Sequence, residues 1–447
     1  MAALRTSPRA RRTLTTVTAA GCLLLGTAAA ANAAPKADLS PPKVLSAENS
    51  RGEAADIAVR DDGSAVAVWT QTMNNERRAT VQVALQDSAG RWGQPTTLSE
   101  SGSDAQRPTI ATNGHDIAVT WEQGSGKGSR IMVTEFDGTW AKPQAISPSG
   151  ATNPELVVDA RGTTSVTWLH ANKNAPTSVE FAQETTAGKF RIQKLTNKSE
   201  SAVSQSMAVS ESGQVSVVWY SLDGNYQVRA ATPSSSAKTT AVTLSSSQLR
   251  TEAVEPAIAT RAGETMAVWQ ETLSDTSQHI AYATMTASGK WSAAALLPEA
   301  DGGAANPQVG VDGSGRATVL WIKSGKCDQG MVSEQRADGS WKPATQITED
   351  NRDNDGLRLD VAKDGRAVAA WPGIDPGDYP YRPPAQINVR DADGKWTGVQ
   401  SLSADGNKCF DPIAKINNSG DIAAIWSLGN GESTSRVEAV TSLAPRG

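Results

Sequence analysis

Eight short segments that end in tryptophan decide the fold of this chain. The first is SAVAVW (64–69), and the others are DIAVTW (116–121), TTSVTW (163–168), QVSVVW (214–219), ETMAVW (264–269), RATVLW (316–321), RAVAAW (366–371) and DIAAIW (421–426). Their tryptophans recur every 51 residues on average. Because each segment alternates with a period of two, it predicts a β-strand, and the long repeat predicts an array of similar β units.

Each unit contains four such strands joined by short turns. In the first unit they are ADIAV (55–59), SAVAVWTQ (64–71), ATVQVALQ (79–86) and GQPTTLS (93–99). Four short antiparallel strands per repeat are typical of a propeller blade. The sequence therefore predicts an all-β, eight-bladed β-propeller of four-stranded antiparallel blades. Seven blades is the alternative, if the divergent fourth unit forms no sheet.

Residues 34–447 are predicted to form one propeller domain. The blades are expected at approximately 52–99, 104–147, 152–196, 203–244, 253–298, 305–348, 357–402 and 411–441. After Trp426 the last unit offers only one further strand, SRVEAVTS (435–442). The early segment PKVLSAEN (42–49) resembles the closing strand PTTLSESG (95–102). We therefore expect residues 42–46 to complete the last blade and close the ring.

The first 33 residues predict export. Four arginines precede an apolar run that ends at Ala31-Asn32-Ala33, as in a secretory signal peptide. The pair Arg11-Arg12 leaves a twin-arginine route open, and Cys22 leaves a lipid anchor as the minor alternative. Loss of the four arginines changes the net charge from −5 to −9. An acidic, secreted, extracellular monomer is expected, with neither nucleic acid nor membrane insertion.

Two cysteines remain outside this leader, Cys327 and Cys409. In an oxidising compartment they predict one long-range disulfide, because both fall in segments expected on the same face of the ring beside the seventh blade. Two free thiols are the alternative.

Several turns have the form Gly-x-Trp. They are DSAGRW (87–92), FDGTW (136–140), SGKW (288–291), DGSW (338–341) and DADGKW (391–396). These turns look like degenerate Asp boxes. Over residues 42–446 the chain resembles secreted bacterial β-propeller repeat proteins, the group that includes sialidase-like Asp-box propellers and TolB-like propellers. The resemblance implies the fold rather than an activity, and no local motif matches the sialidase catalytic residues. The catalytic residues therefore stay unknown and the enzymatic status stays uncertain, with a protein that is not an enzyme favoured.

The tryptophans are interpreted as structural. Those that end the strands recur whatever the neighbouring loops contain, so we expect them to pack between successive blades. The tryptophans of the Gly-x-Trp turns are expected to pack as well, with sugar stacking as the alternative. The three histidines lie at unrelated positions in their units and indicate neither a metal site nor a nucleophile.

The loops of units six to eight are irregular and carry the candidate sites. Asn351, Asp353 and Asp355 place oxygen ligands at alternate positions before Gly356, as at the start of a calcium loop. Calcium is thus the one candidate cofactor, and a solvated acidic turn is the alternative.

The second candidate site is the proline-rich segment 372–384. It contains Asp375, Asp378, Tyr379, Tyr381 and Arg382. Aromatic, acidic and arginine side chains on a stiff loop suit recognition of a glycan or protein ligand. A loop that only shields the rim is the alternative.

Three functions follow from these patterns. The first is a secreted binding or scaffold module that recognises a glycan or a protein through blades six to eight. The second is a glycan-active enzyme, a sialidase-like hydrolase or a lyase, that uses carboxylates such as Asp375 and Asp378. The third is a structural envelope or matrix protein without a discrete ligand.

Overall fold

The computed structural model is built almost entirely from β-strands. It describes residues 36–171, 175–186, 188–222, 226–234, 239–245, 250–286, 288–298, 302–349, 353–354, 356–374, 383–403, 408–429 and 434–442. Among these residues the one helix is the short 3-10 turn η1 (Gly126–Gly128). In the same part of the chain, no helix has the length and apolar character needed to cross a membrane.

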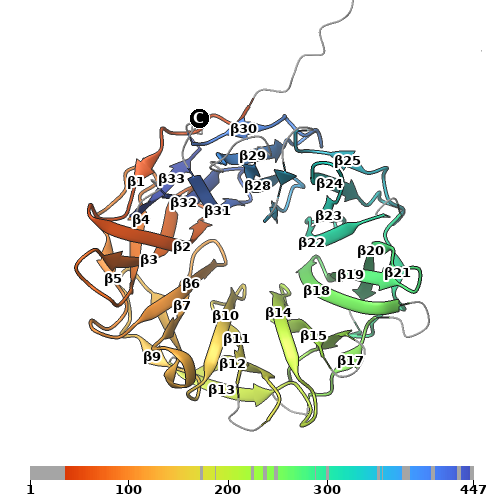
Figure 1. The fold of residues 1–447 in the computed structure, drawn as a ribbon, viewed down its shortest axis with the longest axis horizontal. Coiled ribbons are helices and arrows are strands. Elements are labelled where there is room, and N and C mark those ends of the chain that lie inside the picture. Colours follow the sequence, from red (N-terminus) through yellow and green to blue (C-terminus); the bar gives the residue numbers. More distant parts are fainter. Residues whose placement is uncertain are drawn as a thin grey trace, which may run out of the picture. The chain divides into compact units, whose positions relative to one another are not determined.

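The strands form eight antiparallel blades around a common axis (Figure 1), and a parallel bridge between Arg51 and Ser435 joins blades 1 and 8 into one sheet. Blade 1 consists of β2 (Ser50–Val59), β3 (Ala65–Met73), β4 (Thr80–Gln86) and β5 (Thr96–Thr97), and blade 2 of β6 (Ala105–Thr112), β7 (Ile117–Gln123), β8 (Arg130–Phe136) and β9 (Gln144–Ala145). Blade 3 consists of β10 (Ala151–Val158), β11 (Thr164–His170), β12 (Ser178–Thr186) and β13 (Lys189–Lys194), and blade 4 of β14 (Ala202–Val209), β15 (Val215–Ser221), β16 (Gln227–Ala231) and β17 (Val242–Thr243). Blade 5 consists of β18 (Arg250–Arg261), β19 (Glu264–Leu273), β20 (Gln278–Met285) and β21 (Ala295–Leu296), and blade 6 of β22 (Ala304–Val311), β23 (Ala317–Lys323), β24 (Gln329–Glu334) and β25 (Thr345–Gln346). Blade 7 consists of β27 (Arg358–Val361), β28 (Ala367–Ile374), β29 (Ala385–Arg390) and β30 (Gln400–Ser401), and the short strand β26 (Asp353–Asn354) also pairs with β28. Blade 8 consists of β31 (Lys408–Ile416), β32 (Ile422–Gly429) and β33 (Ser435–Thr441), and β1 (Lys43–Val44) pairs with β33. The predicted eight-bladed propeller is confirmed.

The antiparallel order places different connections on the two faces of the ring. The start of β2 pairs with the end of β3, at Ser50 and Met73, and the end of β2 pairs with the start of β3, at Val59 and Ala65. The loop after each second strand and the link between blades therefore lie on one face, which we call the loop face. The turn after each inner strand lies on the other, which we call the turn face.

The strand-ending tryptophans fill the spaces between blades. All eight are completely buried; they are Trp69, Trp121, Trp168, Trp219, Trp269, Trp321, Trp371 and Trp426. Trp121 of blade 2, for example, packs in one cluster with Val66 and Val68 of blade 1. Burial of each indole stabilises the fold by roughly 2–3 kcal/mol. The predicted packing role is confirmed.

The tryptophans of the Gly-x-Trp turns are half-buried. Each pairs with the end of the third strand of its own blade, as Trp92 does with Gln86. Trp92 and Trp140 also pack against the neighbouring core clusters. These contacts confirm the structural interpretation of the turns.

The N-terminal segment closes the ring as predicted. Lys43 and Val44 pair with Ala439 and Glu438 of β33. The Leu45 amide donates to the Val437 carbonyl at 2.9 Å, and the Val437 amide donates to the Ser46 hydroxyl at 3.0 Å.

The same Leu-Ser pair fastens the outer strand of blade 1. There the Leu98 amide donates to the Val81 carbonyl at 2.9 Å, and the Val81 amide donates to the Ser99 hydroxyl at 2.9 Å. Leu45 and Ser46 thus give the last blade the outer strand that its own end of the chain does not supply.

This closure predicts unequal effects of two neighbouring substitutions. Leu45 is 6% exposed and Val44 is 45% exposed. Leu45→Ala should lower the free energy of unfolding by about 2–4 kcal/mol, because it leaves a cavity at the seam. Val44→Ala should change it by less than about 0.5 kcal/mol. Urea unfolding followed by tryptophan fluorescence measures both, and equal effects would contradict closure through Leu45.

Candidate functional site in the central channel

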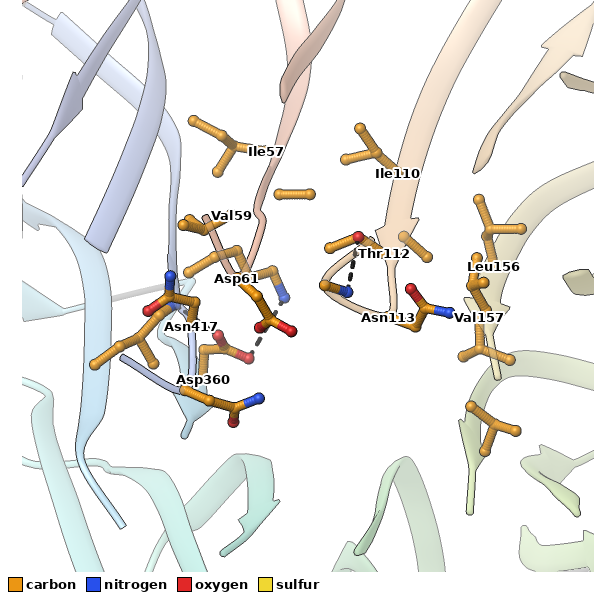
Figure 2. A pocket seen from close by; sticks show the side chains of 18 of the residues that line it. Ile57, Val59, Asp61, Ile110, Thr112, Asn113, Leu156, Val157, Asp360 and Asn417 are labelled. Atoms are coloured by element: carbon orange, nitrogen blue, oxygen red, sulfur yellow. Dashed lines mark hydrogen bonds and ion pairs between the residues drawn. The ribbon is translucent and has the colours of Figure 1, made fainter. Parts of the chain in front are cut away.

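A cavity of about 390 Å³ lies in the central channel. The last residues of β2, β6, β10 and β31 and the turns after them form most of its wall (Figure 2). Asp61, Asn113 and Asn417 give this wall carboxylate and amide groups, and Val59 and Leu156 give it apolar surface. The cavity therefore belongs to the half of the channel near the turn face.

Carboxylates on the inner strands join neighbouring blades. Asp56 Oδ2 accepts a hydrogen bond from the Ile110 amide of blade 2 at 3.1 Å. Asp360 Oδ2 accepts one from the Ile416 amide of blade 8 at 2.8 Å. These bonds fix the spacing of inner strands that do not share a backbone hydrogen-bond ladder.

Lys415 balances the charge of these two acids. Its ammonium lies 3.9 Å from Asp360 Oδ1. Asp360, and secondarily Asp56, raise the pKa of Lys415 against the opposing effect of burial. Burial raises the pKa of Asp56, and Lys415 limits that rise. The three side chains form one electrostatic cluster on the channel wall.

Glu155 has a different environment. Burial raises the pKa of this carboxyl to about 8, although a hydrogen bond from the Met207 amide of blade 4 partly opposes the rise. The side chain is therefore mainly protonated at neutral pH. It joins blades 3 and 4 without adding a charge to the channel.

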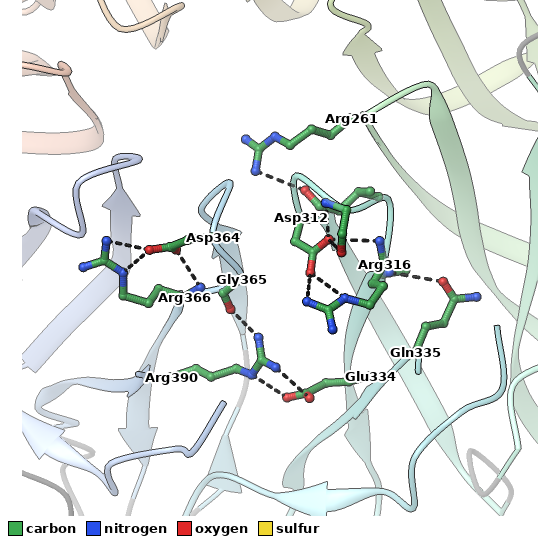
Figure 3. Close-up of polar contacts among 12 residues, drawn as sticks. Arg261, Asp312, Arg316, Glu334, Gln335, Asp364, Gly365, Arg366 and Arg390 are labelled. Carbon is green, nitrogen blue, oxygen red and sulfur yellow. Dashed lines mark hydrogen bonds and ion pairs between the residues drawn. The ribbon is translucent and has the colours of Figure 1, made fainter. Parts of the chain in front are cut away.

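The turns at the base of the channel are fixed by further bonds between blades. Arg261 of blade 5 donates from Nη1 to the Val311 carbonyl at 3.1 Å and to the Val361 carbonyl at 2.8 Å. Figure 3 shows Arg261 reaching toward the turn that contains Asp312. Asn113 Nδ2 donates to the Asp159 carbonyl at 2.9 Å. The cavity thus has a rigid polar base.

An ion pair outside the channel joins blades 6 and 7. Arg390 Nε lies 2.7 Å from Glu334 Oε1, and Nη2 donates to Glu334 Oε2 at 2.9 Å (Figure 3). Lys342 adds a second cation at 2.7 Å from Glu334 Oε2. Because Glu334 is already matched by two cations, we interpret this cluster as a connection between blades.

Asp61 is the acidic group of the cavity best placed for a ligand. It follows β2, its side chain is exposed, and it points into the cavity (Figure 2). Its backbone amide donates to the Gly114 carbonyl at 3.0 Å, which fixes the turn. Among the residues that the structure describes, its carboxylate has no hydrogen-bond or ion-pair partner. A carboxylate held in this way can accept hydrogen bonds from hydroxyl groups of a ligand.

The predicted recognition loop can be placed only at its base. Asp375, Asp378, Tyr379, Tyr381 and Arg382 lie outside the described residues. At the base, the Gly373 amide donates to the Pro384 carbonyl at 3.0 Å, and the Cys409 amide donates to the Pro383 carbonyl at 2.9 Å. The described ends of this segment therefore lie on the loop face, whereas the cavity lies toward the turn face.

The predicted calcium site also stays a prediction. Asn351 and Asp355 lie outside the described residues. The backbone of Asp353 lies in β26, where it pairs with Ile374. Within the described part of the chain, no group of three or more His, Cys, Asp or Glu side chains could hold a metal ion.

The predicted disulfide is absent from the structure: Cys327 and Cys409 are both free thiols. The prediction placed Cys409 in a loop, but it lies in inner strand β31, opposite Leu428, and its side chain is buried between blades 7 and 8. Cys327 lies in the loop after β23 of blade 6, so blade 7 stands between the two positions. Burial raises the pKa of the Cys409 thiol.

The channel residues were not identified from the sequence. Asp56 interrupts the apolar segment ADIAV, whereas Asp360 and Lys415 occupy equivalent places in units seven and eight, two residues further along the inner strand than Asp56. A charged residue in an otherwise apolar inner strand is the signal that could have indicated them. The repeat alone does not show that strands from the two ends of the chain meet at one wall.

Comparison with known proteins supports the fold. No protein-family model matches the chain, and no curated protein matches it. A lectin from Burkholderia pseudomallei has 13% sequence identity and a TM-score of 0.53, over 81% of this chain and 100% of that chain. The fold is that of a β-propeller. The similarity expected from the sequence is thereby confirmed at the level of the fold.

Two glycan-active enzymes are more distant matches. An α-L-arabinanase from Penicillium chrysogenum has 12% identity and a TM-score of 0.44, over 80% of this chain and 97% of that chain. A Hadza microbial sialidase has 10% identity and a TM-score of 0.43, over 90% and 95% of the two chains.

The protonated Glu155 predicts a stability that depends on pH. Because its folded-state pKa lies above the unfolded value, the folded protein should lose stability as pH rises from about 4.5 to about 8. Glu155→Gln removes the titrating group and keeps an acceptor for the Met207 amide. At pH 9 the variant should be more stable than the wild type by roughly 2–4 kcal/mol, and at pH 4.5 the two should agree.

Urea unfolding at pH 4.5, 7 and 9 measures this difference. Gln308 occupies the corresponding position in blade 6, so an amide fits the wall there. The exposed Glu211→Gln is the control and should leave the pH profile unchanged. If Glu155→Gln and the wild type differed in free energy of unfolding by the same amount at all three pH values, the raised pKa of Glu155 would be contradicted.

Lys415 predicts a contribution to the free energy of unfolding that has the opposite pH dependence. Lys415→Met leaves Asp56 and Asp360 without their cation, so at pH 7 it should reduce the free energy of unfolding by roughly 1–3 kcal/mol. The loss should shrink as pH falls, because burial raises the pKa of Asp56 and its carboxylate is neutralised by protonation at acid pH. The exposed Lys290→Met serves as the control in the same urea measurements. A loss that does not change with pH would show that packing, rather than charge, holds Lys415.

Proposed function

We propose that this chain is an exported binding module that recognises a glycan in its central channel. The observation that carries the proposal is the polar cavity of about 390 Å³ with Asp61 directed into it. Small-molecule sites commonly have volumes of roughly 300–1,000 Å³ and combine apolar walls with a few fixed polar groups. The predicted signal peptide supports export.

The local chemistry favours binding over catalysis. In most glycosidases, hydrolysis of a glycosidic bond uses two carboxyl groups that flank the reacting bond. Asp56 and Asp360 instead accept hydrogen bonds from the next blades, and Lys415 lies beside Asp360. The similar Burkholderia pseudomallei structure is a lectin. The proposal for this chain rests on its own channel.

A glycan-active enzyme is the second candidate. It is favoured by the raised pKa of Asp56 close to Asp360, since two acids with different environments can divide acid and base roles. Release of reducing ends from bound oligosaccharides would support this candidate, provided that Asp56→Asn abolished it.

The proposal predicts binding on a glycan array and its loss on substitution of Asp61. The array should include neutral hexose oligomers, N-acetylated sugars, uronates and sialylated glycans, with and without calcium. Asp61→Ala should weaken binding about tenfold, because a fixed acceptor for sugar hydroxyls is lost. The melting temperature should not change, since the carboxylate has no partner among the described residues.

Asp137→Ala is the matched control. Asp137 is an exposed acid on the Gly-x-Trp turn of blade 2, away from the cavity. It should bind the array as the wild type does. Failure of the wild type to bind any glycan would overturn the proposed function, and equal binding by Asp61→Ala would exclude the cavity as the site.

A further inference from the structure

A repeated backbone irregularity marks the inner strands near the loop face. In six blades, one residue that is not glycine has a positive φ of 45–54° at the same place in the repeat. We call these residues the channel-mouth ring; they are Arg107, Asn153, Ser204, Glu255, Asn306 and Asp411. Each lies at a register shift between the inner strand and the second strand, as between Gln106 and Thr109 in blade 2. The shifts are β-bulges.

The residue types in this ring are unexpected for their conformation. A side chain in the left-handed region strains the backbone, whereas glycine adopts that region freely. Blade 7 shows that glycine fits, because Gly356 has φ +64° at the corresponding position. All six members of the ring are nevertheless polar, and all but Asn306 are exposed.

Contacts within the protein account for the polar side chains of only some members of the channel-mouth ring. Arg107 Nη1 donates to Glu122 Oε1 at 2.9 Å, and the Asn306 amide faces the Glu255 carboxylate. The side chains of Asn153, Ser204 and Asp411 have neither a hydrogen-bond nor an ion-pair partner among the described residues. In these three blades, polar groups are thus presented to solvent at a place where glycine would fit.

Exposed aromatic side chains adjoin the same ring. Phe410 precedes Asp411, is 40% exposed, and has the Lys408 ammonium 5.0 Å from its ring centroid. Tyr226 is 39% exposed, and its carbonyl accepts a hydrogen bond from the Ala253 amide at 3.1 Å, two residues before Glu255. Aromatic faces beside hydrogen-bonding groups suit a saccharide, whose rings have apolar faces and hydroxyl edges.

We propose that the channel-mouth ring, with Tyr226 and Phe410, forms a second saccharide-binding surface on the loop face. Sugar rings stack on the two aromatic side chains, and the ring side chains bind hydroxyl groups. This surface lies at the end of the channel opposite the Asp61 cavity. The inference rests on the proposed glycan-binding function and adds to it a contact surface with mixed donors and acceptors.

The test separates backbone strain from ligand contact. The triple variant Asn153→Gly/Ser204→Gly/Asp411→Gly removes three side chains and relieves the left-handed strain, so its melting temperature should equal or exceed that of the wild type. Its binding to the same glycan array should fall at least about tenfold. Phe410→Ala, a change at an exposed position, should also weaken binding and provides a second, independent variant.

Ala262→Gly is the matched control. Ala262 has φ +53° and is exposed in the turn after β18, on the turn face. This variant should gain the same backbone relief and retain full binding. Unchanged binding by both the triple variant and Phe410→Ala would overturn the inference, even if Asp61→Ala lost binding and so supported the cavity. Absence of wild-type binding to any array glycan would overturn the proposed function and, with it, this second surface.

Discussion

The burial of one tryptophan between each pair of successive blades is the constraint on which the remaining structure depends. A four-stranded sheet cannot bury both faces alone, so each blade needs two neighbours. Trp69 packs in a cluster that also contains Ile425 and Ala439 of the last blade, across the seam of the ring. The first and last blades therefore bury each other's apolar surface only when the ring is closed. This explains why Leu45 and Ser46, far from Val437 in sequence, take the place of an outer strand.

Closure creates a second constraint at the axis. The inner strands of neighbouring blades approach one another without a shared backbone ladder, so amides on the free edge of an inner strand need other acceptors. The carboxylate of Asp56 serves Ile110, and that of Asp360 serves Ile416. The charge of these acids is tolerated beside the channel because Lys415 lies 3.9 Å from Asp360, on the blade between those of Asp360 and Asp56. Channel polarity is thus partly a consequence of how the blades are joined, whereas the Asp61 carboxylate, which has no partner among the described residues, takes no part in that joining.

Much of the fold could be predicted because its signals are periodic. The tryptophan spacing predicted the blades, and the likeness of LSAEN (45–49) to LSESG (98–102) predicted the closing strand. Cys409 shows the limit of that reasoning. The blade was expected to begin at residue 411, but β31 begins at Lys408 and carries the thiol into the core between blades 7 and 8. A shift of three residues at a strand end was enough to convert an expected loop cysteine into a buried one.

The candidate sites were harder to predict because they arise from convergence rather than from local pattern. Asp61, Asn113 and Asn417 come from three blades and meet only in the closed ring. The channel-mouth ring also depends on backbone conformation: Asn153 and Ser204 are unremarkable in sequence until their positive φ values place them at equivalent bulges. A repeat fold can therefore keep one backbone in every blade and vary its chemistry at a single bulge position. In the proposed second surface, six blades of one ring would present polar side chains to the same ligand.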